Sequence, residues 1–309
     1  MMALITHYTT APTTTQRSKT CHFLLSFVLV AIIWMLSSNF SGHEPFLALL
    51  PAVSDATQEF KSDQLATTNT VAVMIEDRPL ETLLPLLLHF SLVLGPAWPI
   101  IFYTSQSIYP DSAPLRRAID DHRIIVRFLP SMTQLSSRDS VSKFLTEPWL
   151  WEQLAPAEHV LLFQADSIIC SNSALRVDDF LQYDFVGAPI NPALGVGEGY
   201  NGGLSLRNRT MVLDIIGESS WREEKDAAKD SQDPGVKFED QWFFRKMKLR
   251  GARLPSIEVA RTFAVETLWY ERPLGYHQVT RWQPHNQDKV NAWCPEYGLT
   301  VPNVKAGHV

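Results

Sequence analysis

Short apolar runs alternate with longer segments of helical length between residues 70 and 163. The runs are rich in β-branched and aromatic residues, as is typical of buried strands, and they span 71–75, 99–104, 123–128 and 159–163. The segments between them span 80–95, 114–121 and 141–154. Strands that alternate with helices predict a doubly wound α/β fold, in which helices cover both faces of a mainly parallel sheet.

The second half of the chain has a less regular pattern. Further strands are expected at 183–190, 202–208 and 262–267, and further helices at 210–217 and 240–251. Between these helices, the stretch 221–235 is dense in charged residues, which predicts a solvated, mobile loop.

One stretch near the N-terminus has the length and composition of a membrane-spanning helix. Residues 21–36 carry no Asp, Glu, Lys or Arg, and the uncharged stretch continues to residue 40. Arg17 and Lys19 precede it and no Lys or Arg follows directly, so the positive-inside rule places the N-terminus in the cytosol. A cleaved signal peptide is the alternative, although the apolar region of such a peptide is usually shorter.

The chain is therefore predicted to consist of a cytosolic tail at 1–20, a transmembrane signal anchor at 21–40, a flexible stem at 41–69 and a globular domain at 70–309. The stem is expected because its residues are mostly small and polar with little periodicity. The chain would then be a single-pass type II protein of the Golgi or endoplasmic reticulum membrane, with its domain in the lumen. A second apolar stretch, 79–96, is interrupted by Glu, Pro and His, so we expect a core helix there.

Charge and cysteine content narrow the choice of partners and compartment. The chain has a formal net charge of -6 and no dense block of Lys and Arg, which argues against nucleic acid as a partner. Apart from Cys21 in the apolar run, Cys170 and Cys294 form one disulfide in a lumenal domain or stay reduced, and the reduced state is the preferred expectation. Asn39 and Asn208 begin triplets that have the form of N-glycosylation acceptors.

The stretch VLLFQADS ends a predicted central strand with a carboxylate, Asp166. Ligands of a doubly wound sheet bind beyond the carboxyl ends of its strands. A carboxylate there, together with oxygen or imidazole ligands, can hold Mg²⁺ or Mn²⁺ against the two phosphates of a nucleotide-sugar. The alternative is that Asp166 only starts a turn. His277 follows a tight Pro-Leu-Gly turn and could supply the imidazole, with a purely structural histidine as the alternative.

Two further segments carry residues that such a site would use. The triplet Asn201-Gly202-Gly203 would let backbone amides come close to a sugar or phosphate, although the same triplet also forms hairpin turns. Asp240 could take the proton from an acceptor hydroxyl and Glu239 could orient the sugar. The alternative for this acidic pair is a helix N-terminus, which favours negative charge.

In their order along the chain, six segments resemble a known family. These are VAVMIEDRP, FQADS, YDFVGAP, YNGGLSLRNR, FEDQWF and VETLWYERPLGYHQ. From about residue 70 to residue 277, they are similar to a fungal family of membrane-anchored, glycosyltransferase-like proteins described as a domain of unknown function (DUF5672), which looks like the GT-A nucleotide-sugar transferases. The resemblance implies that 70–309 is a GT-A-like catalytic domain that uses a nucleotide-sugar donor, a glycan or protein acceptor, and Mn²⁺ or Mg²⁺.

The resemblance also implies roles for individual residues. Asp166 falls on the final Asp of the Asp-x-Asp motif, and His277 sits where some members have a metal-binding His. Asp240 falls on the acidic position that serves as base in inverting members. The first position of the Asp-x-Asp motif is Gln164 here, and a neutral amide adds no charge at the ion, so the metal affinity should be lower than with two carboxylates.

We therefore expect a metal-dependent, inverting glycosyltransferase of the hexosyltransferase type, with Asp166 and His277 as metal ligands, Asp240 as catalytic base and Glu239 beside it. The donor would be bound by Glu76, Arg78, Gln164, Ser167, Asn201, Gly202 and Gly203. One alternative is a catalytically inactive membrane protein of the same fold that binds a glycan or a nucleotide-sugar. A hydrolase is the other, although no Gly-x-Ser-x-Gly or His-Glu-x-x-His motif is present.

Overall fold

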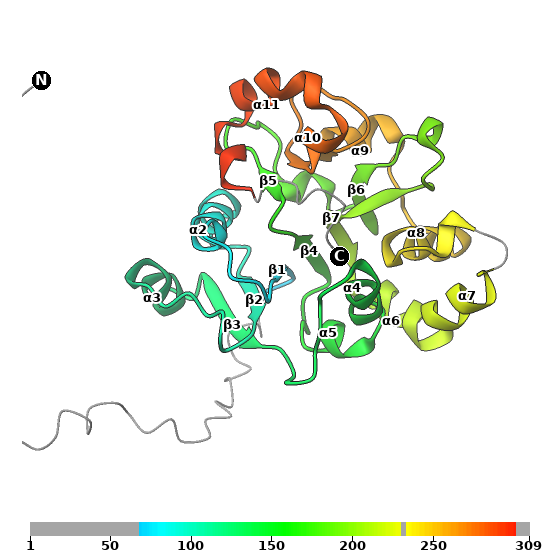
Figure 1. Ribbon diagram of the computed structural model, residues 1–309, viewed down its shortest axis with the longest axis horizontal. Coiled ribbons are helices and arrows are strands. Elements are labelled where there is room, and N and C mark those ends of the chain that lie inside the picture. Colours follow the sequence, from blue (N-terminus) through cyan, green and yellow to red (C-terminus); the bar gives the residue numbers. More distant parts are fainter. Residues whose placement is uncertain (1–67, 230–232, 301–309) are drawn as a thin grey trace, which may run out of the picture. The chain divides into compact units, whose positions relative to one another are not determined.

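A computed structural model describes residues 68–229 and 233–300 of the chain (Figure 1). The predicted tail, signal anchor and most of the stem lie outside these residues, as does the triplet at Asn39. Within the described ranges, no helix is both long enough and apolar enough to cross a membrane.

A six-stranded sheet forms the centre of the described domain. Its strands are β1 (Thr70–Ile75), β2 (Ile100–Thr104), β3 (Ile124–Phe128), β4 (His159–Phe163), β6 (Phe185–Pro189) and β7 (Tyr200–Asn208), in the spatial order β3-β2-β1-β4-β7-β6. The first four strands are parallel to one another, whereas β7 runs antiparallel to both of its neighbours. The predicted mainly parallel sheet with β4 in its interior is confirmed.

Helices lie on both sides of this sheet, which explains why its strands are almost continuously apolar. Figure 1 shows α2 (Leu83–Leu94) and α3 (Ala113–Asp120) on one side, and α4 (Arg138–Leu145), α5 (Pro148–Glu152), α6 (Arg209–Glu218) and α8 (Glu239–Leu249) on the other. The expected core helix at 79–96 is therefore α2, a helix of 12 residues. Its Phe90 stacks on Phe163 of β4, with ring centroids 3.9 Å apart.

The order of the strands creates a switch point between β1 and β4. From β1 the chain builds outward through β2 to β3, and then returns to the opposite side of β1 as β4. The connections on the two sides diverge there, and ligands of open α/β sheets generally bind beyond the carboxyl ends of the strands at such a point. The residues that follow Ile75 and Phe163 are therefore the first candidates for binding.

A second, three-stranded sheet joins the end of β4 to a segment from far along the chain. It contains β5 (Ser167–Ile169), β9 (Gly275–His277) and β8 (Ala264–Val265), in the order β5-β9-β8. Ser167 pairs with His277 in the antiparallel register of β5 and β9. The remaining helices and 3₁₀ turns are η3 (Val177–Phe180), η4 (Pro192–Leu194), α7 (Trp221–Ala227), η5 (Pro234–Val236), α9 (Ile257–Phe263), α10 (Val279–Trp282), η6 (Pro284–Asn286), α11 (Gln287–Trp293) and η7 (Pro295–Leu299).

Two local predictions in the second half are wrong. Of the predicted loop 221–235, the described part begins with a helix, α7, and the hydroxyl of Ser220 caps this helix by accepting a hydrogen bond from the backbone of Glu223. Trp221 is buried, and its indole donates to the carbonyl of Val236 at 3.1 Å. The stretch 262–267 is the end of helix α9 followed by the short strand β8, where a longer strand was expected.

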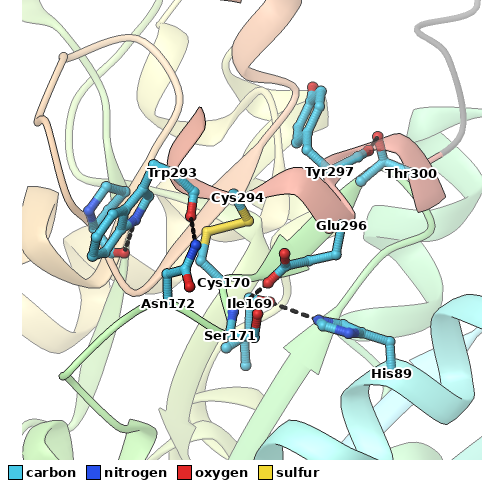
Figure 2. Close-up of a disulfide and its surroundings, with 11 residues drawn as sticks. His89, Ile169, Cys170, Ser171, Asn172, Trp293, Cys294, Glu296, Tyr297 and Thr300 are labelled. Carbon is cyan, nitrogen blue, oxygen red and sulfur yellow. Dashed lines mark hydrogen bonds between the residues drawn. A yellow bond between two sulfur atoms is a disulfide. The ribbon is translucent and has the colours of Figure 1, made fainter. Parts of the chain in front are cut away.

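A disulfide joins Cys170 to Cys294, which corrects the expectation of two reduced cysteines. The two Cα atoms are 4.9 Å apart although 124 residues separate them in sequence. Figure 2 shows that hydrogen bonds surround the bridge: Asn172 donates to the carbonyl of Trp293 at 2.9 Å, and the ring of His89 bonds the carbonyl of Ile169 at 2.7 Å. The bridge therefore fixes the end of β5 to the C-terminal helices.

Candidate functional site

Asp166 lies in a tight turn at the carboxyl end of β4, next to the switch point. The turn is closed by the Ser167 hydroxyl, which donates to the carbonyl of Gln164 at 2.8 Å. Ser167 is fully buried, so its side chain stabilises the turn and is not accessible to a nucleotide-sugar, contrary to the predicted donor-binding role. The Gln164 side chain is exposed, and that of Asp166 is 26% exposed. The turn-forming role and the binding role proposed for Asp166 are therefore compatible.

His277 faces Asp166 across the pairing of β5 with β9. Its Nε2 lies 3.3 Å from Oδ1 of Asp166, and the imidazole is only 2% exposed. Both of these atoms are buried and have no hydrogen-bond partner among the residues described. Gln278 holds the other carboxylate oxygen of Asp166 by donating from its side-chain amide at 2.7 Å. The structure thus brings together Asp166 and His277, the two residues that were predicted as metal ligands.

Glu266, which follows β8, lies on the other side of the His277 ring. Its Oε1 is 3.5 Å from Nδ1 of His277. The same oxygen accepts hydrogen bonds from the indole of Trp282 at 3.1 Å and from the amide of Asn201 at 3.4 Å. We call Asp166, His277, Glu266 and Gln278 the carboxylate–histidine cluster.

The electrostatics of the cluster follow from two carboxylates around one imidazole. Burial opposes the charged form of His277, but Asp166 and Glu266 outweigh it and raise the pKa of His277 to about 10. Burial also opposes ionisation of Asp166, but His277 and the amide of Gln278 hold the pKa of its carboxyl below the ordinary value. Without a bound cation, Asp166 and His277 therefore form an ion pair.

The pair also fits a divalent cation. Ligand atoms about 2.0–2.2 Å from one ion are held roughly 3 Å apart, which is close to the observed separation of Oδ1 and Nε2. Carboxylate oxygen and imidazole nitrogen are ligands that suit Mn²⁺. No group of three or more His, Cys, Asp or Glu side chains is placed to hold a metal within residues 68–229 and 233–300. Phosphate oxygens and water would have to fill the other coordination positions.

Asn201, Gly202 and Gly203 lie within β7 and pass close to the cluster. A Cβ at Gly203 would lie 2.2 Å from Nε2 of His277, so only glycine lets the backbone approach the ring. The carbonyl of Gly203 accepts a hydrogen bond from the backbone of Gln164 at 2.8 Å. The hairpin alternative for this triplet is wrong, because these residues are interior to a nine-residue strand.

Asp240 occupies the first turn of α8 and binds the glycine segment. One of its carboxylate oxygens accepts from the backbone of Gly202 at 2.9 Å, and the other from the backbone of Gln241 at 2.7 Å. Burial, and then the negative charge of Glu239, raise the pKa of Asp240 to about 7. A carboxyl with a pKa near neutral pH suits general acid–base chemistry.

Glu239, beside Asp240, is held on the other side by buried partners. Its Oε1 lies 3.3 Å from the guanidinium of Arg207, which is fully buried, and its Oε2 accepts from the hydroxyl of Ser142 at 3.0 Å. Arg207 also lies over the ring of Phe185, 5.1 Å from its centroid. Both carboxylate oxygens of Glu239 therefore have protein partners, and its main contact is structural.

Glu76 and Arg78 follow β1 at the switch point. Glu76 is buried and accepts two bonds from the guanidinium of Arg78, at 2.8 and 2.7 Å. This contact, and the charge of Asp166 more weakly, raise the pKa of Arg78. The Arg78 side chain remains 55% exposed. Arg78 thus presents a positive charge at the same edge of the sheet as Asp166, because both residues follow the carboxyl ends of neighbouring parallel strands.

Sequence reasoning missed Glu266, Gln278 and Arg207. Glu266 had a detectable signal, because it ends the apolar run FAV as Asp166 ends VLLF. Gln278 gave none, and its backbone has the unusual positive φ of 44° for a residue other than glycine. Arg207 gave none because nothing in YNGGLSLRNR indicates that an arginine will be fully buried.

Other parts of the domain do not extend the cluster. A cavity of about 330 Å³ is lined by the loop 269–272 and Arg261. A second cavity, of about 550 Å³, is lined by residues of α4 to α7. No residue of the carboxylate–histidine cluster lines either of these two cavities. Asn208 is buried and caps α6 by accepting from the backbone of Met211, so the structure does not support it as a glycosylation acceptor.

Comparison with known proteins assigns the chain to a family. The family described as "Protein of unknown function (DUF5672)" matches residues 123–277, half of the chain, and the chain belongs to this family. The matched range contains Asp166, Asn201 to Gly203, Asp240, Glu266 and His277. No curated protein matches the chain.

Among solved structures, the chain is similar to two crystal structures of the glycosyltransferase GlyE of Streptococcus pneumoniae TIGR4. The apo form has 11% sequence identity and a TM-score of 0.43, over 76% of this chain and 65% of that chain. The other structure has 15% identity and a TM-score of 0.40, over 76% and 66%. The chain thus spans slightly less than two thirds of either glycosyltransferase structure. At this distance the similarity assigns no activity, donor or metal to the chain.

Proposed function

We propose that this chain is a GT-A-type glycosyltransferase that moves a sugar from a nucleotide-sugar donor to an acceptor hydroxyl of a glycan or protein. The observation that carries the proposal is the arrangement at the β1/β4 switch point. There, Asp166 Oδ1 and His277 Nε2 are buried, lack hydrogen-bond partners in the described part of the chain and lie 3.3 Å apart.

Asp166 and His277 would hold Mn²⁺ or Mg²⁺ against the diphosphate of the donor. When bound, the cation supplies charge that stabilises the departing diphosphate. Arg78 adds a second positive charge on the same side, and buried Glu76 fixes its guanidinium. Gln164 is exposed beside Asp166 and can donate or accept a hydrogen bond without adding charge.

Asp240 would act as the base in a direct displacement. The two backbone N–H groups that bond its carboxylate fix its orientation, and its pKa of about 7 lets it accept a proton near neutral pH. The acceptor hydroxyl would lose its proton to Asp240 as its oxygen bonds the anomeric carbon and the bond to the diphosphate breaks. A single displacement of this kind inverts the anomeric configuration. Asn201 and the two glycines lie between Asp240 and the cluster, where the sugar would bind.

The membrane location is also part of the proposal. Residues 21–40 would anchor the chain as a type II protein, with residues 70–309 in the lumen of the Golgi or endoplasmic reticulum. The Cys170–Cys294 disulfide supports this compartment, because disulfides persist in oxidising environments.

A donor panel tests the activity. The full chain, purified in detergent with Mn²⁺, is incubated with nucleotide-sugars and mixed acceptors, and release of the nucleoside diphosphate is measured. Asp166→Ala should lower turnover at least 100-fold, in the range expected for loss of a group that stabilises the transition state. The matched control is Asp214→Ala on the exposed face of α6, which should leave turnover unchanged. Unchanged turnover in Asp166→Ala would contradict the assignment of the metal.

A catalytically inactive binding protein is the second candidate. It is favoured by the neutral Gln164 and by the fact that only two side chains of the cluster, Asp166 and His277, present unpartnered atoms to a shared ion. Calorimetry separates the two functions. Nucleotide-sugar binding that is indifferent to Mn²⁺ and accompanied by no product supports the binding protein.

A further inference from the structure

We propose that Glu266 is a positioning residue that fixes His277 for the cation and couples it to the Asn201–Gly203 segment. This inference rests on the proposed function, because it deepens the metal site assigned there. Glu266 is itself not a ligand in this scheme, since its contacts run to His277, Trp282 and Asn201.

The contacts of Glu266 converge on one oxygen. Its Oε1 faces nitrogen atoms from β7, β9 and α10, at 3.4 Å from Asn201, 3.5 Å from His277 and 3.1 Å from Trp282. Glu266 is only 4% exposed. A buried carboxylate is costly unless it is paired and hydrogen-bonded, so this one defines the positions of the groups around it.

The position of Glu266 selects which nitrogen of His277 is free to bind an ion. A neutral imidazole carries one N–H and one lone pair. If a cation took the place of the proton on Nε2, the remaining N–H would belong on Nδ1, which faces Glu266, and the lone pair of Nε2 would be left for an ion beside Oδ1 of Asp166. Carboxylates that hold metal-binding histidines in this way raise the basicity of the ligand and fix the ring.

Gly203 limits the ring from the opposite side. The backbone passes so close that a Cβ there would meet all three of the nearest ring atoms of His277, at 2.2 to 2.7 Å. The side-chain carbonyl of Asn201 accepts from the backbone of Gly203 at 2.7 Å, and its amide donates to Glu266. Glu266 therefore lies 3.5 Å from Nδ1 of the imidazole, a charge contact without a hydrogen bond, and it binds the glycine segment through Asn201.

The test measures Mn²⁺ affinity of the full chain directly, by electron paramagnetic resonance of free Mn²⁺ and by calorimetry. Loss of a carboxylate that orients a metal ligand weakens binding about 10- to 100-fold. We expect Glu266→Ala to raise the Kd for Mn²⁺ by about 100-fold, the upper end of that range. Glu266→Gln keeps the shape and one accepting oxygen but loses the charge, and should raise the Kd about tenfold, the lower end.

Asp184→Asn is the matched control. Asp184 is also 4% exposed, and its carboxylate accepts three bonds from Arg253 and one from Asn208, so replacing it should lower the melting temperature. Because Asp184 has no contact with the cluster among these bonds, the Kd for Mn²⁺ should stay unchanged. A purely structural role for Glu266 would produce the same pattern as this control.

The outcomes separate the inference from the function on which it rests. A wild-type chain that does not bind Mn²⁺ overturns the metal assignment and this inference together. If the wild-type chain binds Mn²⁺ and both Glu266→Gln and Glu266→Ala bind it as tightly as wild type does, the inference alone is overturned. If Glu266→Ala does not fold, Glu266→Gln decides: an affinity equal to that of wild type refutes the positioning role, and a tenfold loss supports it.

Discussion

Replacing Asp240 with Asn should change how the free energy of unfolding depends on pH. Burial next to Glu239 raises the pKa of Asp240 to about 7 in the folded chain, whereas an unfolded Asp titrates near about 3.9. Between these values the folded chain keeps a proton that the unfolded chain has lost. Because the folded-state pKa is the higher one, this stabilisation is complete below about pH 4 and disappears as the pH rises through about 7.

The magnitude follows from the two pKa values. They differ by about three, and one pKa unit corresponds to about 1.4 kcal/mol, so the whole effect is roughly 4 kcal/mol. Of this, roughly 3 kcal/mol falls between about pH 4.5 and pH 8. The charge of Arg207 and the backbone N–H groups of Gly202 and Gln241 lower the pKa of Asp240, but burial and Glu239 outweigh them.

The Asn variant has no proton to lose at this position. Relative to wild type, its free energy of unfolding should therefore rise by roughly 3 kcal/mol from about pH 4.5 to pH 8. Asn can accept only one of the two backbone bonds that Asp240 makes, which costs about 1–3 kcal/mol at every pH. The slope with pH, and not the offset, is the quantity that tests the reasoning.

Urea unfolding of both proteins across this pH range measures the slope. Asp184→Asn is the opposite control, because hydrogen bonds from Arg253 outweigh burial and hold the pKa of Asp184 below the ordinary value. Its stabilisation is present above the unfolded pKa and is lost only in more acidic solution, so that variant should show a flat difference above about pH 5. The reasoning is refuted if the difference in free energy of unfolding between Asp240→Asn and wild type stays constant within about 1 kcal/mol over this pH range. Asp240 would then already be ionised in the folded chain at the acidic end of the range.

Three further predictions concern the same region. Gly203→Ala should lower the free energy of unfolding by about 1–3 kcal/mol, because the added methyl group collides with His277, and calorimetry should show weaker Mn²⁺ binding in the same variant. Arg207→Met should lower it by about 3–5 kcal/mol in urea unfolding, since Glu239 is left buried without its cation, and Arg207→Met combined with Glu239→Gln should recover part of the loss. Turnover should rise with pH through about 7, as Asp240 loses the proton that blocks its action as a base, and a pH–rate profile that is flat from about pH 5.5 to 8.5 would contradict that role.

Several features of this protein could be predicted because they depend on neighbours in the sequence. A strand covered on both faces must be apolar along its whole length, and β1 to β4 are therefore visible as runs separated by helical segments. The same runs show where each strand ends, and that placed Asp166 at the carboxyl end of an interior strand. The helix α2 could be distinguished from a membrane span because its sequence contains Pro85 and His89.

Other features depend on contacts that the sequence does not encode locally. A dense charge pattern in 221–235 gave no sign that Trp221 would anchor a helix in the core. Asn208 has the form of a glycosylation acceptor, but its side chain is used to cap α6. Local composition predicts exposure only on average, and each of these side chains is buried by a partner from another element.

The sequence by itself determined the alternation of strands and helices and the carboxylate at the end of β4, since both follow from which residues must leave water. Only the tertiary structure decided that Glu266 lies beside His277, on the other side of the ring from Asp166, and that Cys170 is bonded to Cys294. Gln278 and Asp166 are 112 positions apart, and they are joined because β5 pairs with β9. A contact between residues so far apart forms only if the packing of the intervening elements offsets the entropy lost on closing the long loop. A local pattern of residues therefore does not predict it.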